Sequence, residues 1–189
     1  MPHYKQQNAM RITGGSLKGR LCRMAQGSLP VRPAMDKMRE ALFAVIGDAL
    51  VGKSFLDLFS GTASIALEAA SRGAGEVVLC EKDKVKADQI LDNVKIAEEV
   101  GLRVRCHFIP VELFVKRCKR CFDFVFMDPP FAYRFKEQLL EAAGNVVSVG
   151  GTLMIHHPSQ EALPKQVGDL VLEDERKFGG SVVSFYRLR

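Results

Sequence analysis

The sequence predicts an α/β protein with a doubly wound, mostly parallel sheet of seven strands. Between residues 54 and 157, short apolar runs of strand length alternate with segments whose apolar residues recur at helical spacing. Strands and helices that alternate in this way form parallel sheets, because each helix returns the chain to the edge where the previous strand began. The last two apolar runs flank Gly179-Gly180, which predicts a closing antiparallel hairpin.

The elements are predicted in order from these patterns. Glycine-rich turns separate short strands in the first ~30 residues. The helix after them is predicted over Met35–Asp48. The seven predicted strands are Ser54–Phe59, Glu76–Glu81, Arg103–Phe108, Phe122–Met127, Gly151–His157, Leu170–Arg176 and Ser181–Arg187. The predicted helices between them are Ala63–Arg72, Lys84–Val100, Val111–Cys118 and Phe135–Ala143. We expect a basic arm or small β-hairpin and helix extension over residues 1–34, and the main domain over residues 35–189.

Positive charge is concentrated at the start of the chain. Residues 1–35 hold six basic residues and no acid, so the rest of the chain is close to neutral although the net charge is +5. A basic arm on a near-neutral body favours a phosphate-rich partner. The side chains that we expect to contact RNA are Arg11, Lys18, Arg20, Arg23 and Arg32.

Composition excludes other classes of protein. No apolar run approaches the roughly 20 residues of a membrane-spanning helix. The first ten residues also lack the apolar core of a signal peptide. Five cysteines form an odd set without the spacing of a disulfide framework. We expect a reduced, cytoplasmic monomer that does not bind membranes.

The stretch Asp128-Pro129-Pro130-Phe131 ends the strand Phe122–Met127. Its carboxylate can accept one N–H of a planar amine. The prolines fix φ and remove backbone donors, so a carbonyl there is free to accept the second N–H. The ring of Phe131 can stack on a base. These four residues therefore predict a catalytic site that holds the amino group of a nucleobase.

Two other strand ends predict a nucleoside-like cofactor. The first predicted strand runs into a turn of small residues before a helix, over Asp57-Leu58-Phe59-Ser60-Gly61-Thr62. Such a turn allows close approach of the backbone, and the helix start offers free N–H groups. Glu81 ends the second strand and can accept from both hydroxyls of a ribose. In doubly wound sheets these ends share one crevice. The alternative is structural, with Asp57 capping the turn and Glu81 exposed to solvent.

Two local patterns match other motifs without their context. Residues 47–54 match the phosphate-binding pattern G-x-x-x-x-G-K-S. That motif needs a strand before it and a helix after it, and here the order is reversed. Cys118 and Cys121 form a single C-x-x-C, whereas a zinc site needs four ligands. We expect neither nucleotide hydrolysis nor a bound metal.

Together these residues resemble the RsmD family of ribosomal RNA guanine-N2 methyltransferases. The N-terminal segments point to this family specifically. They are Arg11-Ile12-Thr13-Gly14-Gly15-Ser16-Leu17-Lys18-Gly19-Arg20 and Arg32-Pro33-Ala34-Met35-Asp36-Lys37-Met38-Arg39-Glu40-Ala41-Leu42-Phe43. The loop Phe55–Thr62 resembles the cofactor loop of the family. The chain departs from the family pattern at Ala63, Ile109-Pro110 and His156-His157.

The resemblance implies a class I, Rossmann-like methyltransferase fold and S-adenosylmethionine as cofactor. It implies methyl transfer to the N2 amine of a guanine in 16S ribosomal RNA, with the small ribosomal subunit as partner. The residues implied to bind the cofactor or close its site are Asp57, Phe59, Ser60, Gly61, Thr62, Glu81, Asp36 and Arg39. Alternatives remain an amino-methyltransferase acting on adenine N6 or cytosine N4, and a non-catalytic RNA-binding or ribosome-assembly protein.

Overall fold

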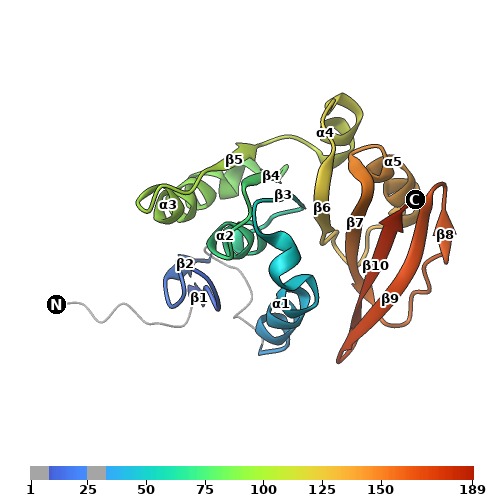
Figure 1. Ribbon diagram of the computed structural model, residues 1–189, viewed down its shortest axis with the longest axis horizontal. Helices are drawn as coiled ribbons and strands as arrows, with labels where there is room; N and C mark the ends of the chain where they lie inside the picture. Colours follow the sequence, from blue (N-terminus) through green and yellow to red (C-terminus); the bar gives the residue numbers. More distant parts are fainter. Residues whose placement is uncertain (1–8, 25–32) are drawn as a thin grey trace.

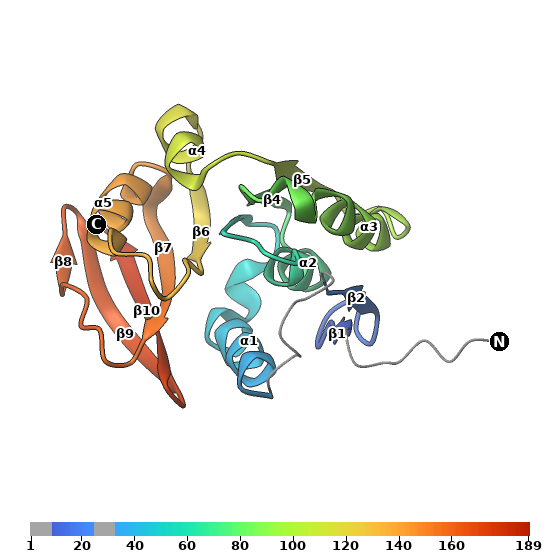
Figure 2. The same ribbon diagram turned by 180° about the vertical axis from the view of Figure 1, so that it is seen from behind.

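The computed structural model describes residues 9–24 and 33–189 and contains one large mixed sheet with helices on both faces (Figures 1 and 2). The strands of this sheet lie in the order β5-β4-β3-β6-β7-β10-β9-β8. The first five are parallel, and β10, β9 and β8 continue the sheet in antiparallel pairing. The predicted fold class is confirmed, and the two-residue strand β8 is an addition at the edge.

The bounds of the elements lie close to those expected. The strands of the large sheet are β3 (Ser54–Leu58), β4 (Glu76–Cys80), β5 (Val104–His107), β6 (Phe122–Met127), β7 (Val147–Pro158), β8 (Gln166–Val167), β9 (Leu170–Phe178) and β10 (Ser181–Leu188). The helices are α1 (Pro33–Ile46), α2 (Ser64–Ser71), α3 (Ala87–Glu98), α4 (Val111–Arg117) and α5 (Lys136–Gly144), with 3-10 turns at Gly47–Leu50 and Lys84–Lys86. A separate hairpin pairs β1 (Ala9–Arg11) with β2 (Leu21–Arg23).

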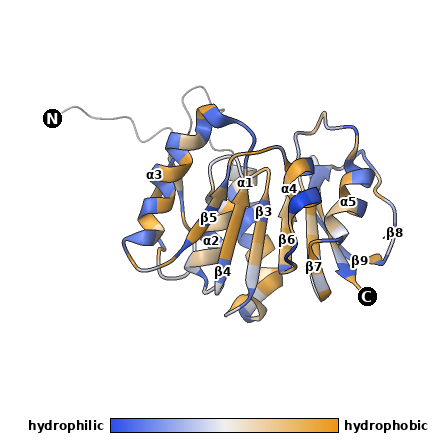
Figure 3. Cartoon of the chain, turned by 90° about the horizontal axis from the view of Figure 1, so that it is seen from above, coloured by the Kyte–Doolittle hydropathy of each residue, from blue (hydrophilic) through white to orange (hydrophobic). Residues whose placement is uncertain are grey.

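Alternate residues of the central strands supply two cores. Phe55 and Phe126 pack on the face that carries α1, α2 and α3. Leu56 and Met127 pack on the opposite face, against α4 and α5. Both faces are therefore apolar, and the central strands are mostly orange in Figure 3. A sheet covered on both sides in this way leaves its strand ends as the place for polar chemistry.

The segment with the pattern G-x-x-x-x-G-K-S lies between a helix and a strand, as predicted. Gly47 begins a 3-10 turn after α1, and Ser54 begins β3. No helix start therefore faces this segment in the way that phosphate binding requires. Among the described residues, no helix is both long and apolar enough to cross a membrane.

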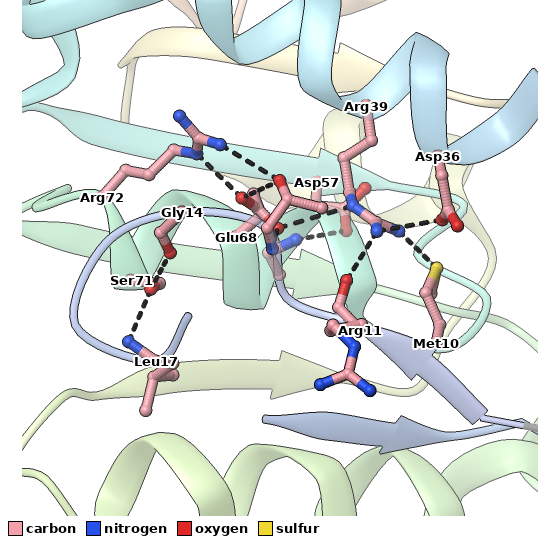
Figure 4. Close-up of polar contacts among 12 residues, drawn as sticks. Met10, Arg11, Gly14, Leu17, Asp36, Arg39, Asp57, Glu68, Ser71 and Arg72 are labelled. Atoms are coloured by element: carbon pink, nitrogen blue, oxygen red, sulfur yellow. Dashed lines mark hydrogen bonds and ion pairs between the residues drawn. The ribbon is translucent and has the colours of Figure 1, made fainter. Parts of the chain in front are cut away.

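The β1–β2 hairpin is tied to the body through the carboxylate of Glu68 on α2, which is fully buried (Figure 4). Glu68 accepts from the backbone N–H and the hydroxyl of Thr13 at 2.9 and 2.7 Å. It also pairs with Arg72 at 2.8 Å and with the Nε of Arg39 at 3.4 Å. The buried charge is thus balanced by two guanidinium groups, one of them from α1.

The hairpin also touches the end of α2 closely. The Ser71 hydroxyl accepts from the N–H of Leu17 at 2.8 Å and donates to the carbonyl of Gly14 at 2.5 Å. A Cβ at Gly15 would lie 1.8 Å from the Ser71 carbonyl oxygen, so this contact requires glycine. The described part of the predicted arm therefore packs as an integral layer of the fold. The boundary between residues 34 and 35 stays a prediction.

We expect Glu68→Gln to destabilise the protein by about 3–5 kcal/mol, because it removes the buried charge that pairs with both the buried Arg39 and the partly exposed Arg72. Urea denaturation measures this loss. Glu173→Gln is the matched control, since Glu173 forms an exposed pair with Arg187 and should change stability by less than about 1 kcal/mol. Equal effects of the two substitutions would show that the Glu68 network does not hold the hairpin.

Candidate active site

The parallel register brings three predicted strand ends to one edge of the sheet. Leu58 lies opposite both Cys80 and Met127. The residues directly after these three are Phe59, Glu81 and Asp128. Backbone hydrogen bonds close the edge, since the N–H of Asp128 donates to Leu58 at 3.3 Å and that of Ser60 donates to Cys80 at 3.1 Å. The predicted convergence of these three ends is present in the structure.

The loop after β3 has an unusual backbone conformation. Phe59, Gly61 and Ala63 all have positive φ, at 62°, 59° and 66°. For the two non-glycine residues this region costs roughly 1–2 kcal/mol each. The methyl of Ala63 is also fully buried. Such a strained loop persists only where its surroundings fix it.

Two buried carboxylates and one amide fix this loop. Asp57 accepts from the Ser60 hydroxyl at 2.7 Å and from the N–H of Ala66 at 3.1 Å. Glu81 accepts from the N–H of Gly61 at 2.9 Å, and the Asn93 amide donates to the carbonyl of Thr62 at 2.9 Å. Asp57 therefore shapes the turn, as the structural alternative expected, and Glu81 is buried rather than exposed to solvent.

The carboxylates of Asp57, Glu81 and Asp128 gather at this edge of the sheet, where the ammonium of Lys86 lies 3.8 Å from Glu81. Burial raises the pKa of Asp57 to about 7, hydrogen bonds from Ser60 and Ala66 oppose the rise, and the negative charges of Asp128 and Glu81 add to it. A positively charged ligand placed here would relieve this repulsion. Glu81 accepts one N–H at each carboxylate oxygen, from Gly61 and Asp83. Each oxygen retains a second lone pair that could accept from a hydroxyl.

The amine-holding stretch leaves one backbone carbonyl available. Pro130 accepts the N–H of Tyr133 at 2.7 Å. Within the described residues, no hydrogen bond is made to the carbonyl of Pro129. Asp128 remains partly exposed, and its Oδ1 lies 2.8 Å from the Nδ1 of His156. Asp128 Oδ2 and the carbonyl of the buried Pro129 accept no hydrogen bond from the described residues, so they are the candidate acceptors for an amine.

Aromatic rings flank this stretch. Phe131 is half exposed and meets the ring of His156 edge-on at 5.4 Å. Tyr133 meets Phe59 edge-on at 5.8 Å, so it joins the loop after β6 to the loop after β3. Phe135 is 62% exposed beside Tyr133. These rings offer stacking surface at the mouth of the crevice.

Lys136 holds the loop that carries Phe131 and Tyr133, and the sequence analysis did not predict this role. Its ammonium is buried and donates to the carbonyls of Phe131 and Tyr133 at 3.1 and 2.6 Å. It also pairs with Glu161 at 2.9 Å. A lysine at the start of a surface helix gives no sequence signal of this role, because the carbonyls it satisfies lie in an irregular loop.

Asp36 and Arg39 are engaged elsewhere in the structure. Arg39 is 3% exposed and donates to Asp36 at 3.0 Å and to the carbonyl of Arg11 at 2.7 Å, besides its contacts with Met10 and Glu68. Its guanidinium thus joins α1 to the hairpin and α2. A direct contact of Asp36 or Arg39 with a cofactor stays a prediction.

The described basic residues of the arm are exposed, but two of them lie beside acids. Arg20 pairs with Glu99, and Arg23 lies 3.9 Å from Asp92. Arg11 donates to the carbonyl of Gly19 at 2.9 Å. Lys18 is exposed at the hairpin turn. Arg32 lies outside the described residues, and contact with RNA stays a prediction for all five.

Comparison with known proteins decides the family. Residues 10–187 match the family described as "Conserved hypothetical protein 95". The chain belongs to this family. The "Ribosomal RNA small subunit methyltransferase D" of Escherichia coli (strain K12) is 31% identical over 152 residues, which are 80% of this chain and 73% of that protein. The resemblance to the RsmD family is thereby confirmed.

Other relatives agree with this result. The "Putative rRNA methyltransferase YlbH" of Bacillus subtilis (strain 168) is 30% identical over 188 residues, 95% of this chain and all of that protein. The structure "Putative methyltransferase yhhF from Escherichia coli" has a TM-score of 0.83 at 24% identity and covers 96% of this chain and 99% of that one. A further structure, "SMU.776, a putative methyltransferase complexed with SAH", has a TM-score of 0.75 at 15% identity, covering 98% and 57%. These two structures share the fold of this chain.

We expect Asp57→Asn to remove one pH-dependent component of stability. The folded pKa of Asp57 is about 7 and its ordinary value is 3.8. Between these values the folded protein retains a proton that the unfolded chain has lost, so stability falls as the pH rises from about 4 to about 7. Asparagine keeps an accepting oxygen and does not titrate.

Urea denaturation at about pH 5 and about pH 8 measures this component. Relative to the native protein, the variant should be more stable at the higher pH than at the lower one. A stability difference that is the same at both pH values would mean that Asp57 is not held protonated by burial.

Proposed function

We propose that this protein transfers a methyl group from S-adenosylmethionine to the exocyclic N2 amine of a guanine in small-subunit ribosomal RNA. The observation that carries the proposal is the pair of candidate acceptors at the end of β6, Asp128 Oδ2 and the Pro129 carbonyl. They lie across one sheet edge from the loop after β3 and from Glu81. The printed names of the relatives support ribosomal RNA as the substrate class.

The residues of the crevice suit this cofactor. Glu81 would accept from the ribose hydroxyls, and the turn over residues 59–62 would lie against the nucleoside. Burial is the main cause of the raised pKa of Asp57, and the negative charges of Asp128 and Glu81 add a smaller repulsion. A sulfonium and an ammonium group would offset that repulsion. Bound S-adenosylmethionine would supply a methyl group that is activated for displacement.

The amine of guanine needs help because its lone pair is delocalised into the ring. If Asp128 Oδ2 and the Pro129 carbonyl accept its two N–H bonds, the nitrogen can pyramidalise and direct its lone pair at the methyl group. The protein supplies position and local electrostatics. As the nitrogen–carbon bond forms and the sulfur–carbon bond breaks, the surplus proton leaves nitrogen for Asp128 or water. Phe131 gives the unstacked base a new stacking surface.

The first test is methyl transfer from labelled S-adenosylmethionine to small subunits that lack the modification, followed by nucleoside digestion. We expect the label in N2-methylguanosine. Asp128→Asn should lower the rate by about 10²–10⁴-fold, because its amide N–H would face the amine and its charge is lost. The control is Asp123→Asn, at the opposite end of β6, where the carboxylate bonds Ser54.

Three outcomes of this test would contradict the proposal. Full activity of Asp128→Asn would remove its role. Label in adenosine or cytidine would identify a different amino-methyltransferase. A chain that binds RNA and neither binds nor consumes S-adenosylmethionine would be an assembly protein.

Because Arg20 of the arm pairs with an acid, one substitution should weaken RNA binding and another should strengthen it. Replacing Arg20 by Gln should weaken RNA binding and make the salt dependence less steep by about one unit. Replacing its partner Glu99 by Gln should strengthen binding, because this frees Arg20 from its pair and removes a negative charge that repels phosphate. Filter binding across a salt series measures both changes, with Glu173→Gln as control. Identical salt slopes in all three variants would exclude this surface.

A further inference from the structure

His156 lies where the register of the sheet predicts a neighbour of Asp128. Met127 on β6 pairs with Ile155 on β7 in parallel register. The next residues along the two strands are Asp128 and His156, on the face that carries α1 and α2. The sequence patterns alone did not connect the two residues.

The contact between them fixes the donor and the acceptor. His156 Nδ1 lies 2.8 Å from Asp128 Oδ1. An ionised carboxylate can only accept, so the proton of the ring is on Nδ1. His156 Nε2 is buried without a partner among the described residues. A proton on Nε2 would bury an N–H donor without an acceptor, which is a second reason for the Nδ1–H tautomer.

We propose that His156 is a positioning residue for methyl transfer: its Nδ1–H holds Asp128 Oδ1, so that Oδ2 is the oxygen presented to the amine. A carboxylate without this bond would rotate and offer either oxygen. The His156 ring also meets Phe131 edge-on at 5.4 Å. One buried side chain thereby orients both the acceptor of the amine and the ring on which its base would stack. This inference rests on the proposed function.

Substitutions of His156 can distinguish a role in orienting Asp128 from a role in packing. The amide nitrogen of asparagine occupies the same position along the side chain as Nδ1, and that of glutamine occupies the position of Nε2. Leucine fills a similar volume without any donor. If His156 acts by packing alone, His156→Leu should therefore keep methyl-transfer activity. If His156 orients Asp128, His156→Asn should keep that activity and His156→Leu should lose it. The asparagine variant also removes the buried, unpaired Nε2.

The test compares these three variants of the full chain for methyl transfer, cofactor affinity and thermal stability. We expect His156→Leu and His156→Gln to lower kcat about 10- to 100-fold while the KM for RNA and the Kd for S-adenosylmethionine change little. His156→Asn should restore most of kcat. Equal kcat in the leucine variant and the native protein, or a loss in the asparagine variant as large as in the leucine variant, would overturn the proposal.

A second measurement is independent of activity and so separates this inference from the proposed function. Long-range ¹⁵N–¹H NMR reports the protonated nitrogen of a histidine ring. For His156 we expect the proton on Nδ1, and Asp128→Asn should shift that resonance. A proton on Nε2, or no shift in the variant, would overturn the inference whatever the enzyme methylates. Failure of the native protein to form N2-methylguanosine, with the Nδ1 proton present, would overturn only the proposed substrate.

Discussion

The parallel pairing of β3 with β4 and β6, and of β6 with β7, is the constraint on which the candidate site depends. Leu58, Cys80, Met127 and Ile155 lie level with one another across four strands. The residues that follow β3, β4 and β6 must therefore emerge at one edge of the sheet, where they begin three loops, and Asp128 contacts His156 of β7. Shifting β6 or β7 by one residue would turn its side chains to the opposite face and separate these two side chains. The two apolar cores thus fix the chemistry indirectly, because they fix the register.

Glu68 plays a comparable part for the hairpin. A two-stranded hairpin of three-residue strands has too little surface to be stable alone. Here its turn is attached to a buried carboxylate that also binds guanidinium groups from α1 and α2. Charges buried together in this way depend on every partner. The basic surface of Arg11, Lys18 and Arg20 is thus held in a set orientation beside the sheet, which a flexible arm would not provide.

The sequence predicted the sheet, its helices and the convergence of three strand ends, because these depend on periodicity and on the geometry of parallel sheets. It did not predict how buried polar groups are paired. Asp57 and Glu81 both bond the loop after β3, Arg39 bonds the hairpin, and Lys136 binds carbonyls of an irregular loop. Some of these pairings join residues 20 or more positions apart, and the others close irregular loops, so neither spacing nor composition encodes them. The contact of His156 with Asp128 was not predicted, although aligning the predicted strands in register would have placed the two residues side by side.

Ala63 has a strained backbone conformation in the loop after β3. The methyl group of an alanine is unfavourable at a positive φ, and the φ of Ala63 is 66°. The strained conformation is held by the bonds of Asp57, Glu81 and Asn93 to neighbouring residues of the loop. Because these bonds exist before any ligand arrives, the cost of the strain falls on folding and not on binding. The same buried carboxylates that hold the loop lie at the same edge of the sheet as Asp128. A cofactor would therefore meet a loop already shaped and carboxylates already in place, which is why a residue unfavourable for the backbone is compatible with the proposed methyl transfer.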